Sequence, residues 1–423
     1  MAEHNNIATR AADQPQSRTS AQWILLALLV ASVFINYIDR GNLSVSATNI
    51  VQELGLTKTQ MGLLLSSFFW TYAACQLLAG WLIDRYNVHW VFAAGFFIWS
   101  MATAATGLVN AFVPLLLCRF VLGFGESVAY PAFSKILASD YEESQRGKAN
   151  AFIDAGSKMG PALGTFAGGM IVAQFGWRAL FLILGLGALV WLPLWLKWAP
   201  RGHTGQTQAV RDAYVPGMLQ LLRHRSVWGS FFALFAINYA WYFMVTWFPF
   251  YLESERHFSK EKMAVLGSIP FAVLAVSASL AGILSDRLIA GGQTPTRVRK
   301  AFIVTGLLLQ TLLLPAGMAA SDTVSMGLFL FACFAFGLTT ANHWAVTQTI
   351  AGPAVAGKWT GMQNAFGNLA GVAAPAFTGW SVDATKSFQL AFVAVAAMVV
   401  MGAAAVAFVI GRIEQENWEP PAR

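Results

Sequence analysis

The sequence predicts an all-α integral membrane protein, and three observations lead to this fold class. Hydrophobic residues make up 57% of the 423 residues and charged residues only 11%, against about 25% charged residues in a soluble domain. The mean hydropathy is +0.56. Apolar stretches of roughly 20 residues, each long enough to cross a bilayer, recur along the whole chain. Long strand-like alternation of polar and apolar residues is absent, which argues against a barrel.

The apolar stretches predict twelve transmembrane helices in two pseudo-symmetric six-helix bundles. The predicted spans are residues 21–46, 58–83, 89–108, 112–138, 148–174, 177–198, 227–252, 262–289, 299–319, 323–349, 357–382 and 387–411. They divide the chain into an N-terminal tail (1–20), an N-terminal bundle (21–199), a linker loop (200–226), a C-terminal bundle (227–411) and a C-terminal tail (412–423). An even number of spans places both tails on one side of the membrane.

The basic residues indicate which side this is. One side of the membrane carries 17 of them: Arg10, Arg18, Arg85, Arg146, Lys148, Lys197, Arg201, Arg211, Arg223, Arg225, Arg287, Arg297, Arg299, Lys300, Lys358, Arg412 and Arg423. The other side carries six: Lys58, Arg178, Arg256, Lys260, Lys262 and Lys386. The positive-inside rule places the richer side, with both tails, in the cytoplasm. We therefore expect a multi-pass protein of the cell inner membrane, in which the net charge of +7 reports topology and not a nucleic-acid partner.

A short motif repeats between the two halves. GWLIDR, residues 80–85, follows the second span, and GILSDR, residues 282–287, follows the eighth, at an offset of 202 (282 − 80). The glycine lets two helices approach, and the aspartate can cap the next helix or pair with an arginine. We expect a gating or structural role for Gly80, Asp84, Arg85, Asp286 and Arg287. A repeated half is the layout of secondary transporters, whose site lies between two bundles.

Six ionisable residues lie well inside predicted spans of the N-terminal half, away from the span ends. They are Asp39, Arg40, Arg119, Glu126, Asp154 and Lys158. A charge at the bilayer centre costs about 2.5–3.5 kcal/mol on insertion scales, so these side chains must face the interior or a wet cavity and pair with one another. The alternative interpretation is that the pairs only lock the helices together. Apolar packing would serve that purpose as well, so we favour a functional site.

The spacing of these residues supports pairing. Arg119 and Glu126 are seven residues apart, which places them on one face of a helix. Asp154 and Lys158 are four apart, where direct contact is possible. Asp39 and the next residue diverge by about 100° and meet different partners. The C-terminal half offers neutral polar groups instead: Asn238, Tyr239, His343, Gln348, Gln363, Asn364 and Asn368.

The charges suggest a mechanism. A cavity with Arg40, Arg119 and Lys158 attracts an anion, and a guanidinium group grips a carboxylate in a two-pronged fork. Asp39 and Glu126 repel that anion when ionised, but burial favours their neutral forms. Protonation of the two carboxylates would free the arginines to bind the substrate. This exchange of partners predicts proton-coupled uptake of an organic anion.

Several motifs resemble known families. GWLIDRYN resembles the cytoplasmic loop motif of the major facilitator superfamily. INYIDRGNLS, RFVLGFGESVAYPAF (119–133) and TWFPFYL (246–252) resemble the anion:cation symporter family within it. This family includes sugar-acid carriers for galactonate, glucarate and hexuronates, carriers for tartrate and aromatic acids, and relatives of sialin and the vesicular glutamate carriers. The resemblance implies a monomeric proton symporter for a small organic anion, most simply a sugar acid, with no cofactor and no enzyme activity.

The resemblance also implies roles for individual residues. Carboxylates matching Asp39 and Glu126 carry proton coupling, and the arginine matching Arg119 pairs with them. The arginine matching Arg40 binds substrate. Further residues match positions that line the substrate or contact it from the other half: Tyr37, Tyr72, Trp344 and Asn364. Ordinary helix packing is the alternative interpretation of Tyr37, Tyr72 and Trp344, and an interhelical hydrogen bond is that of Asn364.

Two departures from the sugar-acid carriers stand near the same site. Ser157 replaces an amide and lies beside Asp154 and Lys158, and His343 replaces a small hydroxyl residue beside Trp344. With Gln363, these residues complete the predicted substrate site. The extra ion pair would reshape the pocket for a dicarboxylate or a more decorated acid, or act as a titrating relay.

Three other interpretations stay open. In the first, the substrate is another carboxylate, such as tartrate or an aromatic acid. In the second, the chain is a proton antiporter that exports an organic anion. In the third, it is a membrane enzyme or sensor. The sequence shows no phosphate-binding loop, Ser-His-Asp arrangement or output domain that would support an enzyme or a sensor. No metal-ligand spacing is present, and we interpret Cys75, Cys118 and Cys333 as core residues without a disulfide framework.

Overall fold

The computed structural model describes residues 15–141, 143–199, 216–416 and 418. The predicted tails and the linker loop therefore lie largely outside the described residues. The N-terminal half forms α1 (Pro15–Val45), α2 (Ala47–Leu54), α3 (Lys58–Arg85), α4 (Val88–Thr106), α5 (Phe112–Glu126), α6 (Ala129–Asp140), α7 (Glu143–Ala188) and α8 (Trp191–Trp198). A short α9 (Met218–Leu222) lies within the predicted linker loop. The C-terminal half forms α10 (Arg225–Ser254), α11 (Lys260–Ala290), α12 (Pro295–Gln310), α13 (Leu313–Met318), α14 (Asp322–Thr385), α15 (Gln389–Ala404) and a π-helical turn, η2 (Ala405–Val409).

Two of these helices are interrupted at glycines. Gly176 in α7 has φ 79° and ψ 167°, and Gly352 in α14 has φ 68° and ψ 170°. Positive φ is a conformation that glycine adopts without the steric cost that other residues carry. The breaks fall between predicted spans five and six and between spans ten and eleven. Within the described residues, nine helices are long and apolar enough to cross a membrane, so the integral membrane class is confirmed and the count of twelve spans stays a prediction.

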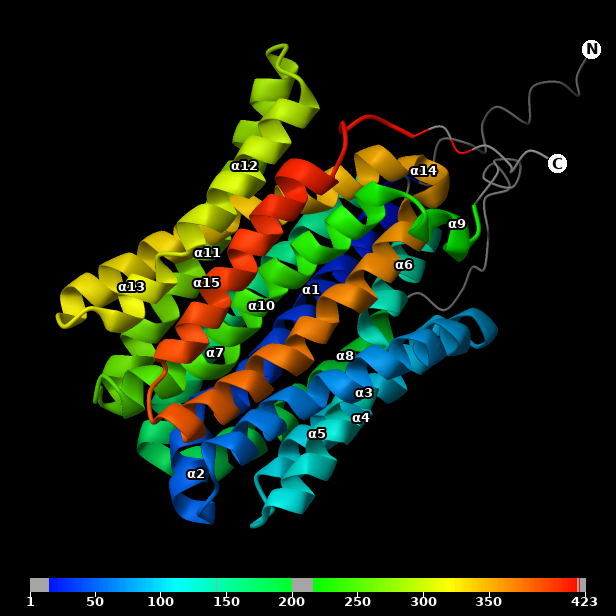
Figure 1. Cartoon of the computed structure of the whole chain (residues 1–423). Helices are drawn as coiled ribbons and strands as arrows, with labels where there is room; N and C mark the ends of the chain where they lie inside the picture. The colour runs from blue at the N-terminus through cyan, green and yellow to red at the C-terminus, as the bar shows by residue number, and fades with distance from the viewer. Residues whose placement is uncertain (1–14, 142, 200–215, 417, 419–423) are drawn as a thin grey trace, which may run out of the picture.

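The helices form two groups that lie side by side (Figure 1). Helices α1–α8 pack mainly on one another, and so do α10–η2; we call them the N-terminal and C-terminal bundles. The main helix pairs that join the bundles are α3 with α14, α7 with α11, and α1 with α10, and a smaller contact joins α2 with α10. In Figure 1 the orange C-terminal part of α14 runs beside the blue α3.

Small residues allow the bundles to approach closely near one end. A Cβ atom on Gly62 of α3 would lie 2.6 Å from the carbonyl oxygen of Pro375 in α14. A Cβ atom on Gly169 of α7 would lie 2.5 Å from the Cβ atom of Ala264 in α11. Small residues at such crossings are typical of helix packing in membranes. These contacts lie toward the end that the charge pattern predicts to face outward, which we call the outer end.

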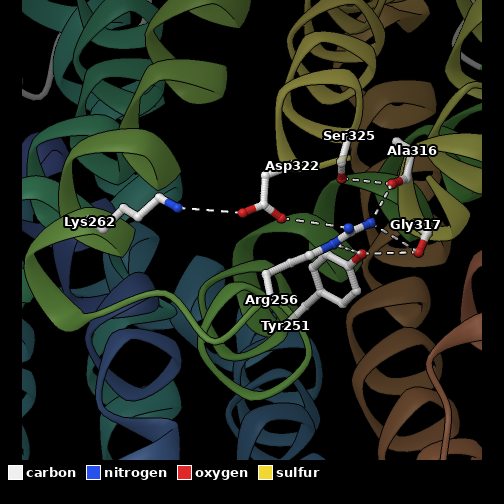
Figure 2. Close-up of polar contacts among 7 residues, drawn as sticks. All are labelled: Tyr251, Arg256, Lys262, Ala316, Gly317, Asp322 and Ser325. Atoms are coloured by element: carbon white, nitrogen blue, oxygen red, sulfur yellow. Dashed lines mark hydrogen bonds and ion pairs between the residues drawn. The ribbon is translucent and has the colours of Figure 1, made fainter. Parts of the chain in front are cut away.

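A network around Arg256 fastens the outer edge of the C-terminal bundle (Figure 2). Its guanidinium group donates to the Tyr251 hydroxyl at 2.8 Å and to the carbonyl oxygens of Ala316 and Gly317 at 3.2 and 3.4 Å. Asp322 lies 3.7 Å from the same group. The two carbonyls belong to the last turn of α13, where a cation satisfies acceptors that the helix leaves free. Arg256 therefore ties the α10–α11 loop to the α13–α14 connection.

The two copies of the repeated motif lie near the C-terminal ends of α3 and α11, away from the outer end. In the second copy, the Asp286 carboxylate accepts a 2.8 Å hydrogen bond from Arg299 of α12, and Arg299 also donates to Asn342 of α14 at 3.0 Å. The aspartate thus pairs with an arginine, one of the two predicted arrangements. Gly80 lies in α3, and Arg85 and Arg287 are exposed; the side chain of Asp84 lies outside the described part of the chain. A gating role for the motif stays a prediction.

We predict that Arg256→Ala destabilises the protein, because the carbonyls of the α13 end and the Tyr251 hydroxyl lose a charged donor. Hydrogen bonds to charged groups contribute about 1.5–3 kcal/mol each when a partner is lost. Thermal unfolding of the purified protein in detergent measures the change. Lys262→Ala is the control, because Lys262 is 48% exposed, its contact with Asp322 is long at 3.5 Å, and its Nζ otherwise lies over the Phe258 ring, 3.6 Å from the ring centre. Equal melting temperatures for Arg256→Ala and wild type would contradict the assigned role.

Candidate functional site

Four of the six predicted intramembrane charges gather inside the N-terminal bundle. Asp39 and Arg40 come from α1, and Arg119 and Glu126 come from α5; their exposed fractions are 2%, 7%, 3% and 0%. Arg119 interacts electrostatically with the other three. Two acids and two bases make a cluster that is neutral in total, which lowers the cost of placing charge inside a membrane protein.

One ion pair connects the two helices. The Nε of Arg40 donates to Oε2 of Glu126 at 3.3 Å. Asp39, the neighbour of Arg40, points elsewhere and accepts a 3.0 Å hydrogen bond from Asn42 of the same helix. The two adjacent residues therefore diverge as predicted. The arginine meets the α5 carboxylate, and the aspartate meets a different partner.

Aromatic rings surround the Arg40 guanidinium group. Its central carbon lies 4.7 Å from the ring centres of Tyr37 and Tyr72 and 5.1 Å from that of Phe68. Arg119 lies 5.4 Å from the centre of the same Phe68 ring. The negative face of an aromatic ring attracts a cation and more so when water is excluded. The rings therefore hold both guanidinium groups in place.

Several polar atoms of this cluster have no hydrogen-bond partner among the described residues. They are Nη2 of Arg40, Nε of Arg119, Oε1 of Glu126 and Oδ2 of Asp39. Most buried polar groups in proteins are paired, and unpaired ones call for an explanation. Two donors on arginines and two acceptors on carboxylates give the cluster free capacity for an anion and for protons.

A narrow cavity lies between the cluster and the C-terminal bundle. Its lining residues are Tyr37, Arg40, Leu65, Phe68, Phe69, Arg119, Trp241, Tyr242, Val245 and Thr246. Three of these were predicted as site residues, namely Tyr37, Arg40 and Arg119. The cavity is bounded by α1, α3 and α5 on one side and by α10 on the other, so both bundles contribute to it.

The α10 wall was missed by the sequence reasoning, and Tyr242 is its most informative residue. The Tyr242 hydroxyl donates to Oδ1 of Asn368 in α14 at 2.7 Å, and its ring centre lies 4.3 Å from that of Phe69 in α3. The sequence marks Asn238 and Tyr239 as polar residues of this span, and a residue one turn further along lies on the same face. That spacing was the available signal.

The predicted pair of Asp154 and Lys158 is present in α7. Lys158 Nζ lies 3.3 Å from Oδ1 of Asp154, and the lysine side chain is 19% exposed whereas the aspartate is 60% exposed. Ser157 Oγ donates to the Asp154 carbonyl oxygen at 2.7 Å. Lys158 is near enough to Tyr37 for an electrostatic interaction. The lysine therefore borders the aromatic side of the Arg40 cluster, while the aspartate points away into a more open region.

The predicted residues of the C-terminal bundle lie apart from the cavity lining. His343 and Gln363 are 1% and 0% exposed and hydrogen-bond each other, and Gln363 also accepts from Thr347 at 2.8 Å. Trp344 is partly buried with its ring centre 5.7 Å from that of His343. The Asn364 carbonyl oxygen accepts from Asn368 at 2.9 Å. In this conformation His343 and Gln363 are partners inside the bundle. Substrate contact by the four α14 residues predicted for the site stays a prediction: His343, Trp344, Gln363 and Asn364.

No cluster of three or more His, Cys, Asp or Glu side chains suited to a metal ion occurs in the part of the chain that the structure describes. The side chains that the structure brings together at the site are guanidinium groups, carboxyl groups and aromatic rings. Such a set binds and releases anions and protons. Together with two helical bundles and a cavity between them, it defines a membrane transporter.

The chain belongs to the major facilitator superfamily. The model of the Major Facilitator Superfamily matches residues 29–375. The family consists of membrane transporters and not of enzymes.

Curated relatives span nearly the whole chain. A hexuronate transporter of Bacillus subtilis (strain 168) is 32% identical over 90% of this chain and 93% of its own length. A probable galactarate/D-glucarate transporter of the same organism is 29% identical, with 94% of each chain covered. A probable galactarate/D-glucarate transporter of Escherichia coli (strain K12) is 29% identical over 95% of this chain and 98% of its own length.

A solved structure shares the fold. The crystal structure of a bacterial homolog of the human lysosomal transporter Spinster superposes with a TM-score of 0.75 at 19% identity, covering 92% of this chain and 94% of that one. At this identity the likeness shows the fold alone, and it confirms the predicted major facilitator architecture.

We predict that Glu126→Ala destabilises the protein more than Glu126→Gln does. The alanine leaves the Arg40 guanidinium group buried without its acceptor, and breaking a buried ion pair in this way costs about 3–5 kcal/mol. The glutamine keeps a carbonyl oxygen at the same place. Thermal unfolding in detergent measures the order of the three melting temperatures. Equal melting temperatures for the two variants would show that the pair does not hold Arg40.

Proposed function

We propose that the protein is a proton-coupled importer of a sugar acid that works by alternating access. The observation that carries the proposal is the buried ion pair between Arg40 and Glu126 beside a cavity between the bundles. The curated relatives named as galactarate/D-glucarate, hexuronate and galactonate transporters support a sugar acid as the substrate. Export of an organic anion in exchange for protons is the rival.

The proposed coupling is an exchange of partners. In the structure Arg40 is held by Glu126 at 3.3 Å. A substrate carboxylate that reaches the cavity competes for the same guanidinium group, which favours two-pronged binding to a carboxylate. Glu126 is then a buried carboxylate without its cation, and burial favours the neutral form. It takes up a proton, so anion and proton enter the site together.

Asp39 provides a second proton position in this scheme. It shares the electrostatic field of Arg119 with Glu126, and its Oδ2 lacks a partner among the described residues. Movement of a proton between the two acids would reset the site after the substrate leaves. Tyr37 and Tyr72 hold Arg40 in place, and Tyr242 offers its hydroxyl oxygen to the substrate from the other bundle.

Lys158 supports a dicarboxylate within the sugar-acid class. It gives the site a third cation besides the two arginines, and its partner Asp154 is mostly exposed. A diacid such as galactarate carries a second carboxylate that would attract this ammonium group. The relatives named as galactarate/D-glucarate transporters agree with this choice.

The orientation and assembly belong to the same proposal. The excess of Lys and Arg in alternate loops supports cytoplasmic tails in a bacterial inner membrane. The cavity lies between two bundles of the same chain, so one chain can form the proposed site, and we propose a monomer that binds a proton and an organic anion.

Transport by the reconstituted protein tests the function. Proteoliposomes are given an inward proton gradient and, in separate samples, galactarate, D-glucarate, galactonate, glucuronate, galacturonate, tartrate or phthalate. Accumulation of one sugar acid, abolished by a proton carrier, is expected. Accumulation of tartrate or phthalate alone would show that the substrate is another carboxylate and not a sugar acid of the set. Efflux driven by the same gradient would establish export.

We predict that Asp39→Asn loses gradient-driven accumulation while substrate exchange across the membrane continues. The amide keeps the volume and the hydrogen bond with Asn42 but cannot carry a proton. Accumulation and counterflow of labelled substrate are measured in the same proteoliposomes. Asp322→Asn serves as the matched control, since Asp322 is 46% exposed at the outer edge. Full accumulation by Asp39→Asn would exclude this residue from coupling.

We predict that Lys158→Ala lowers the affinity for the diacid more than for the matching monoacid, because only the diacid has a carboxylate left for Lys158. Because the ion pair would form at a partly buried position, we expect the ratio of the two dissociation constants to change about tenfold, which is about 1.4 kcal/mol. Binding of galactarate and galactonate is compared in wild type and variant. An unchanged ratio of the two dissociation constants would remove Lys158 from substrate selection.

A further inference from the structure

A carboxylate of the C-terminal bundle caps a helix of the N-terminal bundle at the outer end. Asp383, near the end of α14, accepts hydrogen bonds from the backbone N–H groups of Lys58 at 3.2 Å and Thr59 at 2.6 Å. The Thr59 hydroxyl donates to the same oxygen as the Thr59 N–H group. Lys58 and Thr59 are the first residues of α3.

This contact completes the start of α3. The first N–H groups of a helix have no partner within the helix. Thr57 accepts from the N–H group of Gln60 through a capping box, so the helix satisfies its third N–H group itself. The first two are satisfied by Asp383 from the other bundle. An anion at a helix N-terminus is also favoured by the helix dipole. Separation of the bundles would expose both groups.

A cation of the C-terminal bundle caps a second helix of the N-terminal bundle. Nζ of Lys260, the first residue of α11, donates to the carbonyl oxygen of Val45 at 3.0 Å. Val45 is the last residue of α1, where carbonyl groups lack partners and a positive charge is favoured. Glu253 of α10 accepts from Lys260 at 2.7 Å and holds it in position.

The contacts of Asp383 with α3 and of Lys260 with α1 share one feature. Each places a charge of the C-terminal bundle on a helix end of opposite partial charge in the N-terminal bundle. The two helix ends flank α2, which connects α1 to α3. Between them and the cavity, Ser44 donates to the carbonyl oxygen of Thr246 at 2.6 Å, and Thr246 lines the cavity. The contacts therefore close the outer end directly beyond the site.

We propose that Asp383 and Lys260 form the gate that holds the outer end closed, and that neutralising either one shifts the transporter toward an outward-open state. The proposal goes beyond the proposed function, since it depends on neither the substrate nor the proton. It assigns to Glu253 the role of positioning Lys260. The gate opens by exchanging these hydrogen bonds for water at both helix ends.

The protonation of Asp383 agrees with a permanent charge at the gate. Burial raises its pKa, but hydrogen bonds from Thr59 and from the Lys58 N–H group, together with the charge of Lys386, outweigh burial, so the pKa of Asp383 lies below its ordinary value. A lowered pKa stabilises the closed state at every pH above the ordinary aspartate range, and this contribution is lost only as the pH falls through the lowered value. Protonation of Asp383 therefore does not control the gate near neutral pH.

Distance measurements between spin labels test the gate. The labels replace Gln52 on α2 and Glu255 at the end of α10, both exposed and in different bundles, in a background without the three cysteines. The variants are Asp383→Asn and Lys260→Gln. Their controls are Asp322→Asn and Lys262→Gln, which remove the same charges from a contact inside the C-terminal bundle (Figure 2). All are measured in detergent and in lipid without substrate.

We expect a longer-distance population in Asp383→Asn and in Lys260→Gln, with the ratio of open to closed molecules raised about tenfold, the effect of losing one hydrogen bond to a charged group. The controls should match the wild type. Distance distributions unchanged in both gate variants would overturn the proposal, as would the same shift in the controls.

Further variants keep the test decisive if Asp383→Asn fails to fold. Thr59→Val removes one donor to Asp383 and leaves the backbone donors, so a smaller shift is expected. Asp383→Glu keeps the charge and should remain closed. A failure to transport any acid would bear on the proposed function and not on these distances.

Discussion

The ion pair between Arg40 and Glu126 is the interaction on which the site depends. Both side chains are almost fully buried, and a buried pair is rarely worth more to stability than apolar packing of the same volume. The structure surrounds it with Tyr37, Tyr72 and Phe68 and balances it with a second acid and a second base. A pair so costly and so well supported is best explained as an exchangeable contact, in which an incoming anion takes the place of Glu126.

The arrangement of the bundles gives that exchange a direction. The cavity has one wall from the N-terminal bundle, with the charges, and one from α10 of the C-terminal bundle. Beyond it, the bundles meet through Gly62 and Pro375 and through Asp383 on the start of α3. The charged site and the closed end therefore lie along the same helices, α1 and α3. Motion of one bundle against the other would alter both together.

The sequence predicted the fold and the charged core because both follow from strong physical costs. Charges in a membrane must pair, which singled out Arg40, Arg119 and Glu126, and glycine breaks fall where loops were expected. The α10 wall was not predicted, since Tyr242 is an ordinary aromatic residue until α3 is seen beside it. His343 and Gln363 were assigned to the substrate site by resemblance, but their hydrogen bond inside the bundle depends on side-chain geometry that no pattern encodes. The gate was hidden for the same reason: Asp383 and Lys58 are 325 residues apart.

Proton uptake linked to substrate binding would test the exchange of partners most directly. Purified protein is titrated with D-glucarate by calorimetry at pH 7, in buffers that differ in ionisation enthalpy. If the anion displaces Glu126 from Arg40, the wild type takes up protons from the buffer as it binds, and Glu126→Gln takes up fewer or none. The same proton balance in wild type and Glu126→Gln, at measurable affinity in both, would contradict the mechanism.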